Sequence, residues 1–169
     1  QLAFARALAQ LTDLPWRASL IGRSADSSYA RLVANALPQR ARLAGPLAPA
    51  HLADVWLTAD LLVHPSRHET WGLVVTDALA RGVPAIVSQG TGAAEALASG
   101  TFDGELPGDT IDPENPDALA RLLRRWLTDR DLRSSWRAAA LRSRSCLRRW
   151  DAPASEFATL VGGGHHPLG

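Results

Sequence analysis

Residues 64–84 read HPSRHETWGLVVTDALARGVP, and this stretch decides the fold class. It begins at the end of a continuously apolar run, 61–63, which is typical of a buried parallel strand. A polar loop then leads into a helix predicted from Trp71 to Arg81, which ends at Gly82. A second apolar run, 83–87, predicts another strand. The order of strand, loop, helix and strand indicates one unit of a parallel α/β sheet.

The same alternation extends over the rest of the chain and predicts one α/β domain, a Rossmann-like parallel sheet with helices on both faces. The domain is expected over 1–161, and the glycine-rich tail 162–169 is expected to be disordered. Periodicity predicts strands at 16–21, 42–44, 60–64 and 83–87. It predicts helices at 1–11, 25–37, 49–58, 71–81, 93–98, 117–127, 131–149 and 152–161, with a polar loop over 102–116.

Composition excludes several classes of protein. The 169 residues are 46% hydrophobic and carry a formal net charge of +1, which fits one globular domain and gives no reason to expect a nucleic-acid partner. No apolar run approaches the roughly 18 residues that span a bilayer. Cys146 stands alone, so no internal disulfide forms, and a cytoplasmic location is expected. Ten arginines in 121–149 favour a solvated basic face; the alternative is peripheral contact with an anionic membrane.

The loop before the helix at Trp71 is the candidate for chemistry. In open α/β sheets, ligands bind beyond the carboxyl ends of the strands. The start of this helix offers unpaired backbone N–H groups over 71–74, which suit phosphate oxygens. Gly72 would let a ligand approach the backbone closely.

Two acids, Glu69 and Asp77, lie eight residues apart, one before the helix and one inside it. Carboxylates accept hydrogen bonds from vicinal hydroxyls, so this pair suits a sugar and a ribose. Each position also has a structural interpretation. Asp77 could pair with Arg81 at i+4, and Thr70 could serve only as a helix N-cap.

This stretch resembles the signature of the family 4 (group 1) retaining glycosyltransferases of GT-B fold, and the resemblance extends over most of residues 14–160. The family pattern has Pro-Ser, two residues, Glu, then Gly-Phe-Gly-Leu and a second Glu, followed by a helix that ends in Gly and a Pro-Val-Ile strand. The matching positions here are Pro65, Ser66, Glu69, Gly72, Leu73, Val74, Asp77, Ala78, Gly82 and residues 84–87, with further matches at Gly22, Gly45, Gly92, Glu95 and Trp150.

The resemblance implies that the chain is the donor-binding, C-terminal half of such an enzyme, with a nucleoside diphosphate sugar as substrate and neither metal nor other cofactor. Glu69 would be the catalytic residue and would contact hydroxyls of the donor sugar, while Asp77 would hold the ribose. Backbone amides from Thr70 to Leu73 would take the diphosphate. The implied donor-binding set is Ser66, Thr70, Trp71, Gly72, Leu73 and Asp77, with Gly45, Pro46 and Leu47 near the nucleobase.

The sequence departs from the family pattern at the site itself. Asp77 replaces the second Glu, and Thr70-Trp71 replace Gly-Phe. The family's basic residues on the diphosphate come from a first strand that is not matched here, and the N-terminal acceptor domain is not matched either. We therefore expect the chain to be inactive alone. The acceptor of the complete enzyme is expected to be a carbohydrate, a lipid or a small molecule. The alternatives are a non-catalytic or degenerate sugar-nucleotide-binding module, or another GT-B enzyme such as a nucleotide-sugar epimerase.

Histidines and tryptophans near the site have plainer interpretations. His64 and His68 flank the loop, where a structural or solvent-facing role is favoured over contact with phosphate or proton transfer. The tryptophans other than Trp71 are expected in the core or at an interface rather than as stacking platforms.

Overall fold

The computed structural model describes residues 1–23 and 26–145, and the elements alternate as the periodicity predicts. Cys146, Trp150, the predicted helix 152–161 and the tail 162–169 lie outside the described residues. In chain order the elements are α1 (Leu2–Ala9), β1 (Ala18–Ile21), α2 (Ser27–Ala36), β2 (Ala41–Gly45), α3 (Pro49–Thr58), β3 (Leu62–His64), α4 (Leu73–Ala80), β4 (Ala85–Ser88), α5 (Gly92–Ser99), β5 (Gly108–Ile111), α6 (Pro116–Thr128) and α7 (Arg130–Ser143).

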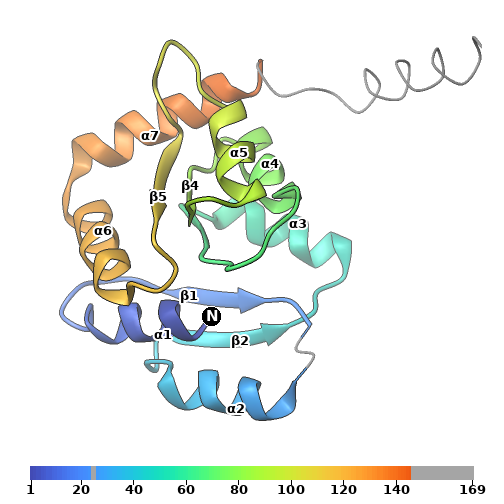
Figure 1. Cartoon of the computed structure of the whole chain (residues 1–169), viewed down its shortest axis with the longest axis vertical. Helices are drawn as coiled ribbons and strands as arrows, with labels where there is room; N and C mark the ends of the chain where they lie inside the picture. The colour runs from blue at the N-terminus through green and yellow to red at the C-terminus, as the bar shows by residue number, and fades with distance from the viewer. Residues whose placement is uncertain (24–25, 146–169) are drawn as a thin grey trace, which may run out of the picture.

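The parallel α/β fold class is as predicted, and within it the strands are divided between two parallel sheets rather than joined in one. One sheet pairs β1 with β2, and the other has the order β3-β4-β5. Figure 1 shows β1 and β2 lying side by side below the second sheet, with α2 beneath them. Among the described strands, β1 pairs with β2 alone and β3 pairs with β4 alone. Each sheet is therefore open at both outer edges, and β1 and β3 each have one edge without a strand partner among the described strands.

The polar loop predicted over 102–116 contains a strand, β5, which the sequence analysis missed. Gly108 of β5 pairs with Ala85 of β4, and Ile111 pairs with Ser88. The strand reads GDTI, so it lacks the apolar run that marks the others. Its glycine is needed for sheet packing: a Cβ on Gly108 would lie 1.8 Å from the Ala85 carbonyl oxygen.

Two clusters of buried side chains support the sheets. The first joins α1, α6 and α7 to the sheets and includes a stacked pair, Trp126 and Trp136, whose ring centroids are 5.4 Å apart. Trp16 packs on it and donates from Nε1 to the Leu11 carbonyl oxygen at 2.7 Å. The second cluster lies among α4, α5, α7 and β4. The tryptophans at these positions are core residues, as predicted.

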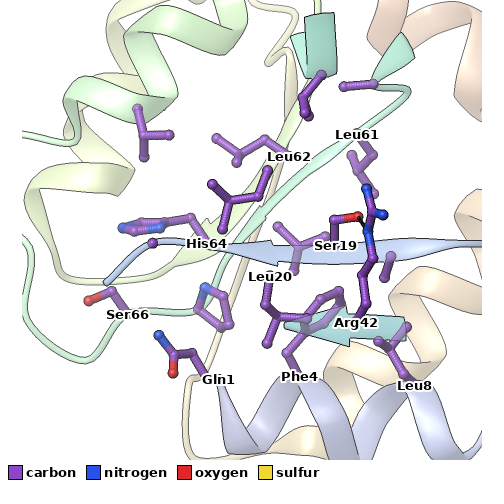
Figure 2. A pocket seen from close by; sticks show the side chains of 18 of the residues that line it. Gln1, Phe4, Leu8, Ser19, Leu20, Arg42, Leu61, Leu62, His64 and Ser66 are labelled. Carbon is purple, nitrogen blue, oxygen red and sulfur yellow. Dashed lines mark hydrogen bonds between the residues drawn. The ribbon is translucent and has the colours of Figure 1, made fainter. Parts of the chain in front are cut away.

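A cleft of about 2140 Å³ lies between the two sheets. Figure 2 shows Phe4 and Leu8 of α1, Leu20 of β1 and Leu61 and Leu62, beside and within β3, converging on it. Both sheets thus line one space, at the position where each has a free edge. The expectation that the domain lacks a first strand stays a prediction.

The basic segment after residue 121 packs on the domain through several of its arginines. Arg124 binds Asp13 through two nitrogens, at 2.7 and 2.9 Å. Arg137 pairs with Asp60, and Arg142 pairs with Glu105. Part of the predicted basic face is therefore neutralised within the fold. Over residues 1–23 and 26–145, no helix has the length and apolarity needed to cross a membrane.

Candidate functional site

The loop of residues 65–72, here called the acid loop, connects the carboxyl end of β3 to the start of α4. Glu69 lies at its centre, and its carboxylate is held from two sides. One oxygen, Oε2, lies 3.1 Å from Nε2 of His64, the last residue of β3. The other, Oε1, accepts the backbone N–H groups of Gly72 at 3.2 Å and Trp71 at 3.3 Å. The acid is thus fixed between a strand end and a helix start.

These contacts favour the ionised form of Glu69. The Gly72 amide makes the largest contribution and the His64 ring the second, and together they hold the pKa of the Glu69 carboxyl below its ordinary value of 4.5. Glu69 and His64 are each half-buried, with 28% of the side chain exposed. A carboxylate that is charged, anchored and still accessible can accept hydrogen bonds from hydroxyls of a ligand.

Helix α5 holds the acid loop from behind. The Gly92 N–H donates to the Glu69 carbonyl oxygen at 2.8 Å. A Cβ on Gly92 would lie 2.1 Å from the Thr70 carbonyl oxygen, and one on Gly72 would lie 2.8 Å from the Cα of Ala93. Gly72 also has a left-handed φ of +59°. The sequence analysis assigns Gly72 to close approach of a ligand; in the structure the neighbour that needs this glycine is α5.

The acid loop is also held together from within. The Ser66 hydroxyl donates to the His68 carbonyl oxygen at 2.8 Å. Arg67 bonds Glu114 through two nitrogens, at 2.7 and 3.0 Å, on the exposed surface. These bonds give Ser66 and Arg67 structural roles in the loop, whatever ligand it takes.

Asp77 lies one helical turn into α4 and is paired with Arg81. The Arg81 Nη1 atom lies 3.4 Å from the Asp77 carboxylate and donates to the Asp77 carbonyl oxygen at 2.8 Å. Arg81 in turn lies over the Trp56 ring, 5.6 Å from its centroid. The i+4 pair that the sequence analysis weighed against a ribose contact is therefore present, and the exposed Asp77 carboxylate would have to share Arg81 with a ligand.

The structure gathers part of the predicted site around one cleft. Ser66 and Asp77 line it together with Pro46 and Leu47 from the turn after β2, and His64 lines it as well. Glu69 reaches this wall through His64. Gly45 lies next to Pro46 in the chain, and its carbonyl accepts the Gly22 N–H at 3.0 Å. Thr70, Trp71 and Leu73 lie outside the cleft on the exposed surface, where 76% of Trp71 and 58% of Leu73 is accessible.

Two of the amides that the sequence analysis assigns to the diphosphate already have a partner. The N–H groups of Trp71 and Gly72 bind Glu69, so a phosphate reaches them only if Glu69 moves. The following amides, of Leu73 and Val74, open α4 without an intrahelical acceptor, as the first N–H groups of a helix do. The anion site predicted at this helix start therefore shifts toward Leu73 and Val74.

The sequence analysis names His64 and favours a structural or solvent-facing role, but it does not predict the contact of this side chain with Glu69. His64 has the position of a strand end before a Glu five residues on, but only the turn of the acid loop brings the two side chains together. Among the described residues, no group of three or more His, Cys, Asp or Glu is placed to hold a metal ion. The absence of a metal from the reaction stays a prediction.

Solved structures share this fold along nearly the whole chain. A sucrose-phosphate synthase from Thermosynechococcus elongatus is 26% identical, with a TM-score of 0.73 over 96% of this chain and 42% of that one. The Anabaena protein Alr3699/HepE, solved in complex with UDP and glucose, is 21% identical, with a TM-score of 0.78 over 96% of this chain and 44% of that one. These neighbours are glycosyltransferases of the GT-B fold, so the fold predicted from the sequence is confirmed.

Relatives identified by sequence are also named glycosyltransferases. A D-inositol 3-phosphate glycosyltransferase from Streptomyces avermitilis is 34% identical over 119 residues, which cover 70% of this chain and 24% of the relative. One from Kineococcus radiotolerans is 32% identical over 153 residues, covering 81% of this chain and 35% of the relative. The chain thus spans about a quarter to a third of the relatives it matches. The model of the family "Glycosyl transferases group 1" matches residues 2–143, and the chain belongs to this family.

Proposed function

We propose that this domain binds a nucleoside diphosphate sugar and serves, within a larger enzyme, the retaining transfer of a hexose-type sugar to an acceptor. The observation that carries the proposal is the Glu69 carboxylate, anchored by His64 and by the Gly72 amide at the carboxyl end of β3. A fixed anion next to free helix-start amides offers acceptors for sugar hydroxyls and donors for phosphate oxygens within one loop.

Each group has a part in this reaction. The free Oε lone pairs of Glu69 accept from donor sugar hydroxyls and orient the ring. The amides of Leu73 and Val74, with the positive end of the α4 dipole, take diphosphate oxygens, whose negative charge grows as the bond to the sugar breaks. The acceptor hydroxyl attacks the anomeric carbon from the face that the diphosphate leaves and gives its proton to an oxygen of the departing diphosphate, so configuration is retained without a covalent intermediate on the protein.

The cleft beside the acid loop suits the nucleoside. Asp77 accepts from the ribose hydroxyls once Arg81 yields one of its contacts, and Pro46 and Leu47 give an apolar wall for the base. Support for a nucleotide sugar also comes from the Anabaena structures, which were solved with UDP and with UDP-glucose. The acceptor, a carbohydrate, a lipid or a small molecule, would be bound mainly by a separate N-terminal domain of the same enzyme.

Saturation-transfer NMR of the protein with UDP, GDP, ADP and their sugars tests the donor site. We expect saturation of the base and ribose protons of one nucleotide, with a weaker signal in Asp77→Ala. This method detects weak complexes, which suits an exposed site. A signal that is equal for all nucleotides and unaffected by Asp77→Ala would refute the assignment of the cleft.

A second candidate, a sugar-nucleotide-binding module without transferase activity, is favoured by one observation. Asp77 is shorter than the family's glutamate and is already paired with Arg81. Turnover by the full-length protein separates the two. An enzyme transfers sugar, and Glu69→Ala lowers its turnover by orders of magnitude while the fold is kept; a binding module retains the nucleotide and transfers nothing.

A further inference from the structure

We propose that His64 is a positioning residue that fixes the Glu69 carboxylate for its contact with the donor sugar. This inference rests on the proposed function and extends it to a side chain outside the family motif as matched in this sequence. Its basis is the contact between His64 Nε2 and Glu69 Oε2 at 3.1 Å, which joins the end of β3 to the acid loop.

Two anchors on different atoms determine the orientation of a carboxylate, whereas one anchor leaves it free to turn. The amides of Gly72 and Trp71 both bind Oε1, so by themselves they act as a single pivot. His64 binds Oε2 from the opposite element. Because an ionised carboxylate only accepts, the imidazole donates from Nε2–H in this contact. Without His64, Oε2 loses its partner and the carboxylate can rotate about Oε1.

Rotation would matter because Glu69 lies against the predicted phosphate site. The carboxylate occupies two helix-start amides and leaves those of Leu73 and Val74 free. Its second oxygen, Oε2, faces His64 instead of these amides, and in the proposed site this is the oxygen that contacts the sugar. Small misplacement of an orienting group is costly for a reaction that depends on substrate geometry. His64 thus affects the sugar half of the donor and leaves the nucleoside half alone.

His64 has no other assignment in the fold that explains its side chain. It is half-buried at the cleft, and in the described part of the chain Glu69 is the recorded hydrogen-bond partner of its ring. Its backbone belongs to the β3–β4 ladder opposite Val87, which a change of side chain leaves in place. Substitution is therefore expected to keep the fold.

The test compares affinity for UDP-glucose with affinity for UDP, measured by calorimetry on the full chain. In His64→Leu we expect UDP-glucose binding to weaken about 10-fold, the loss of one charge-assisted hydrogen bond, and UDP binding to stay unchanged. His64→Gln, whose amide can donate to Oε2, should restore most of the affinity. His51→Leu, on the exposed surface of α3, is the matched control and should change neither.

A second readout needs no ligand. If His64 positions Glu69, the amide NMR resonances of Trp71 and Gly72 shift in His64→Leu and return toward their wild-type positions in His64→Gln. An unchanged ratio of UDP-glucose to UDP affinity in His64→Leu, or unshifted amides, would overturn the positioning role. Failure of the wild-type chain to bind UDP, GDP, ADP or any of their sugars, with the amide shifts present, would instead overturn the proposed function and keep the His64–Glu69 coupling.

Discussion

The two sheets of this domain differ in how much of their surface the fold already covers. Every residue of β4 is buried, and the acid loop after β3 meets α5 backbone to backbone. In β1 and β2, buried residues are absent and several side chains face solvent, including Leu43 at 41% exposure. The acid loop therefore sits on the packed half, whereas Pro46 and Leu47, assigned to the base, sit on the open half.

This difference separates two requirements of a donor site. In the proposed site, the group that would orient the reacting sugar needs a rigid support, which the β3-β4-β5 sheet gives to Glu69. The base would be held by apolar contact, which tolerates a looser wall. We infer that changes in the packed half disturb the fold first, and that matched changes in the open half leave it stable.

Matched glycines give an expected difference of about 2 kcal/mol between the two halves. Gly92→Ala places a Cβ 2.1 Å from the Thr70 carbonyl oxygen, which is backbone and cannot move aside cheaply. We expect a loss of about 3 kcal/mol in the free energy of unfolding. Gly45→Ala meets no atom within 4 Å and carries only the strain of its φ of +69°, about 1 kcal/mol. Urea denaturation measures both values.

Equal losses in the two glycine variants would contradict the comparison, because they would mean that backbone strain rather than packing sets the cost. A destabilised Gly92→Ala protein should also show altered amide resonances in the acid loop. This follows because Gly92 donates to the Glu69 carbonyl oxygen.

Matched aliphatic side chains in the two sheets give the next effect. Ile86 in β4 is fully buried, so Ile86→Ala should lower the free energy of unfolding by about 2–4 kcal/mol. Leu43 in β2 is 41% exposed, and Leu43→Ala should cost less than about 1 kcal/mol. Thermal and urea unfolding of both variants check the prediction. A Leu43→Ala cost as large as that of Ile86→Ala would show that the β1–β2 half is as tightly packed.

The same division explains what could be predicted from the sequence. The runs 61–63 and 83–87 both identify strands, because local pattern suffices there; β4 is fully buried as predicted, whereas β3 is only half-buried. The site at the motif from Glu69 to Asp77 stays a prediction. β5 was missed because its sequence GDTI has a single apolar side chain, Ile111, and so shows no apolar run. The separation into two sheets depends on contacts between distant strands, which periodicity does not report.

Side-chain geometry within the loop was also beyond the sequence. Glu69 and Asp77 were both identified as acids of a site, yet their surroundings differ. Glu69 is anchored by His64 and two amides, whereas Asp77 is paired with Arg81 on the surface. The i+4 spacing of Asp77 and Arg81 predicts the contact between these two side chains. The His64 contact depends on how the acid loop turns, which residue types alone do not determine.

Breaking the Asp77–Arg81 pair is expected to have a smaller effect, and to raise nucleotide affinity rather than to lower it. Arg81→Ala removes an exposed i+4 pair worth about 0.3–0.5 kcal/mol and a contact with the Trp56 ring, so stability should change by less than about 1 kcal/mol. Because the freed Asp77 can then accept from ribose, UDP affinity should rise about 2-fold. Calorimetry measures this, with Asp77→Ala as the variant expected to weaken binding. Weaker UDP binding in Arg81→Ala would assign Arg81 itself to the nucleotide.

Acid sensitivity gives the smallest effect and tests whether Glu69 is anchored in the free protein. Its pKa is lowered in the fold by Gly72 and His64, so ionised Glu69 contributes stability at pH values above 4.5, the ordinary value. That contribution is lost as pH falls through the lower, folded pKa. The difference in unfolding free energy between wild type and Glu69→Gln should therefore shrink below pH 4.5 and stay constant above it, as urea titrations at several pH values would measure. A difference that does not depend on pH would mean that the Glu69 carboxyl has the same pKa in the folded and unfolded chains. The contacts with Gly72 and His64 would then not stabilise the ionised carboxylate in the folded protein.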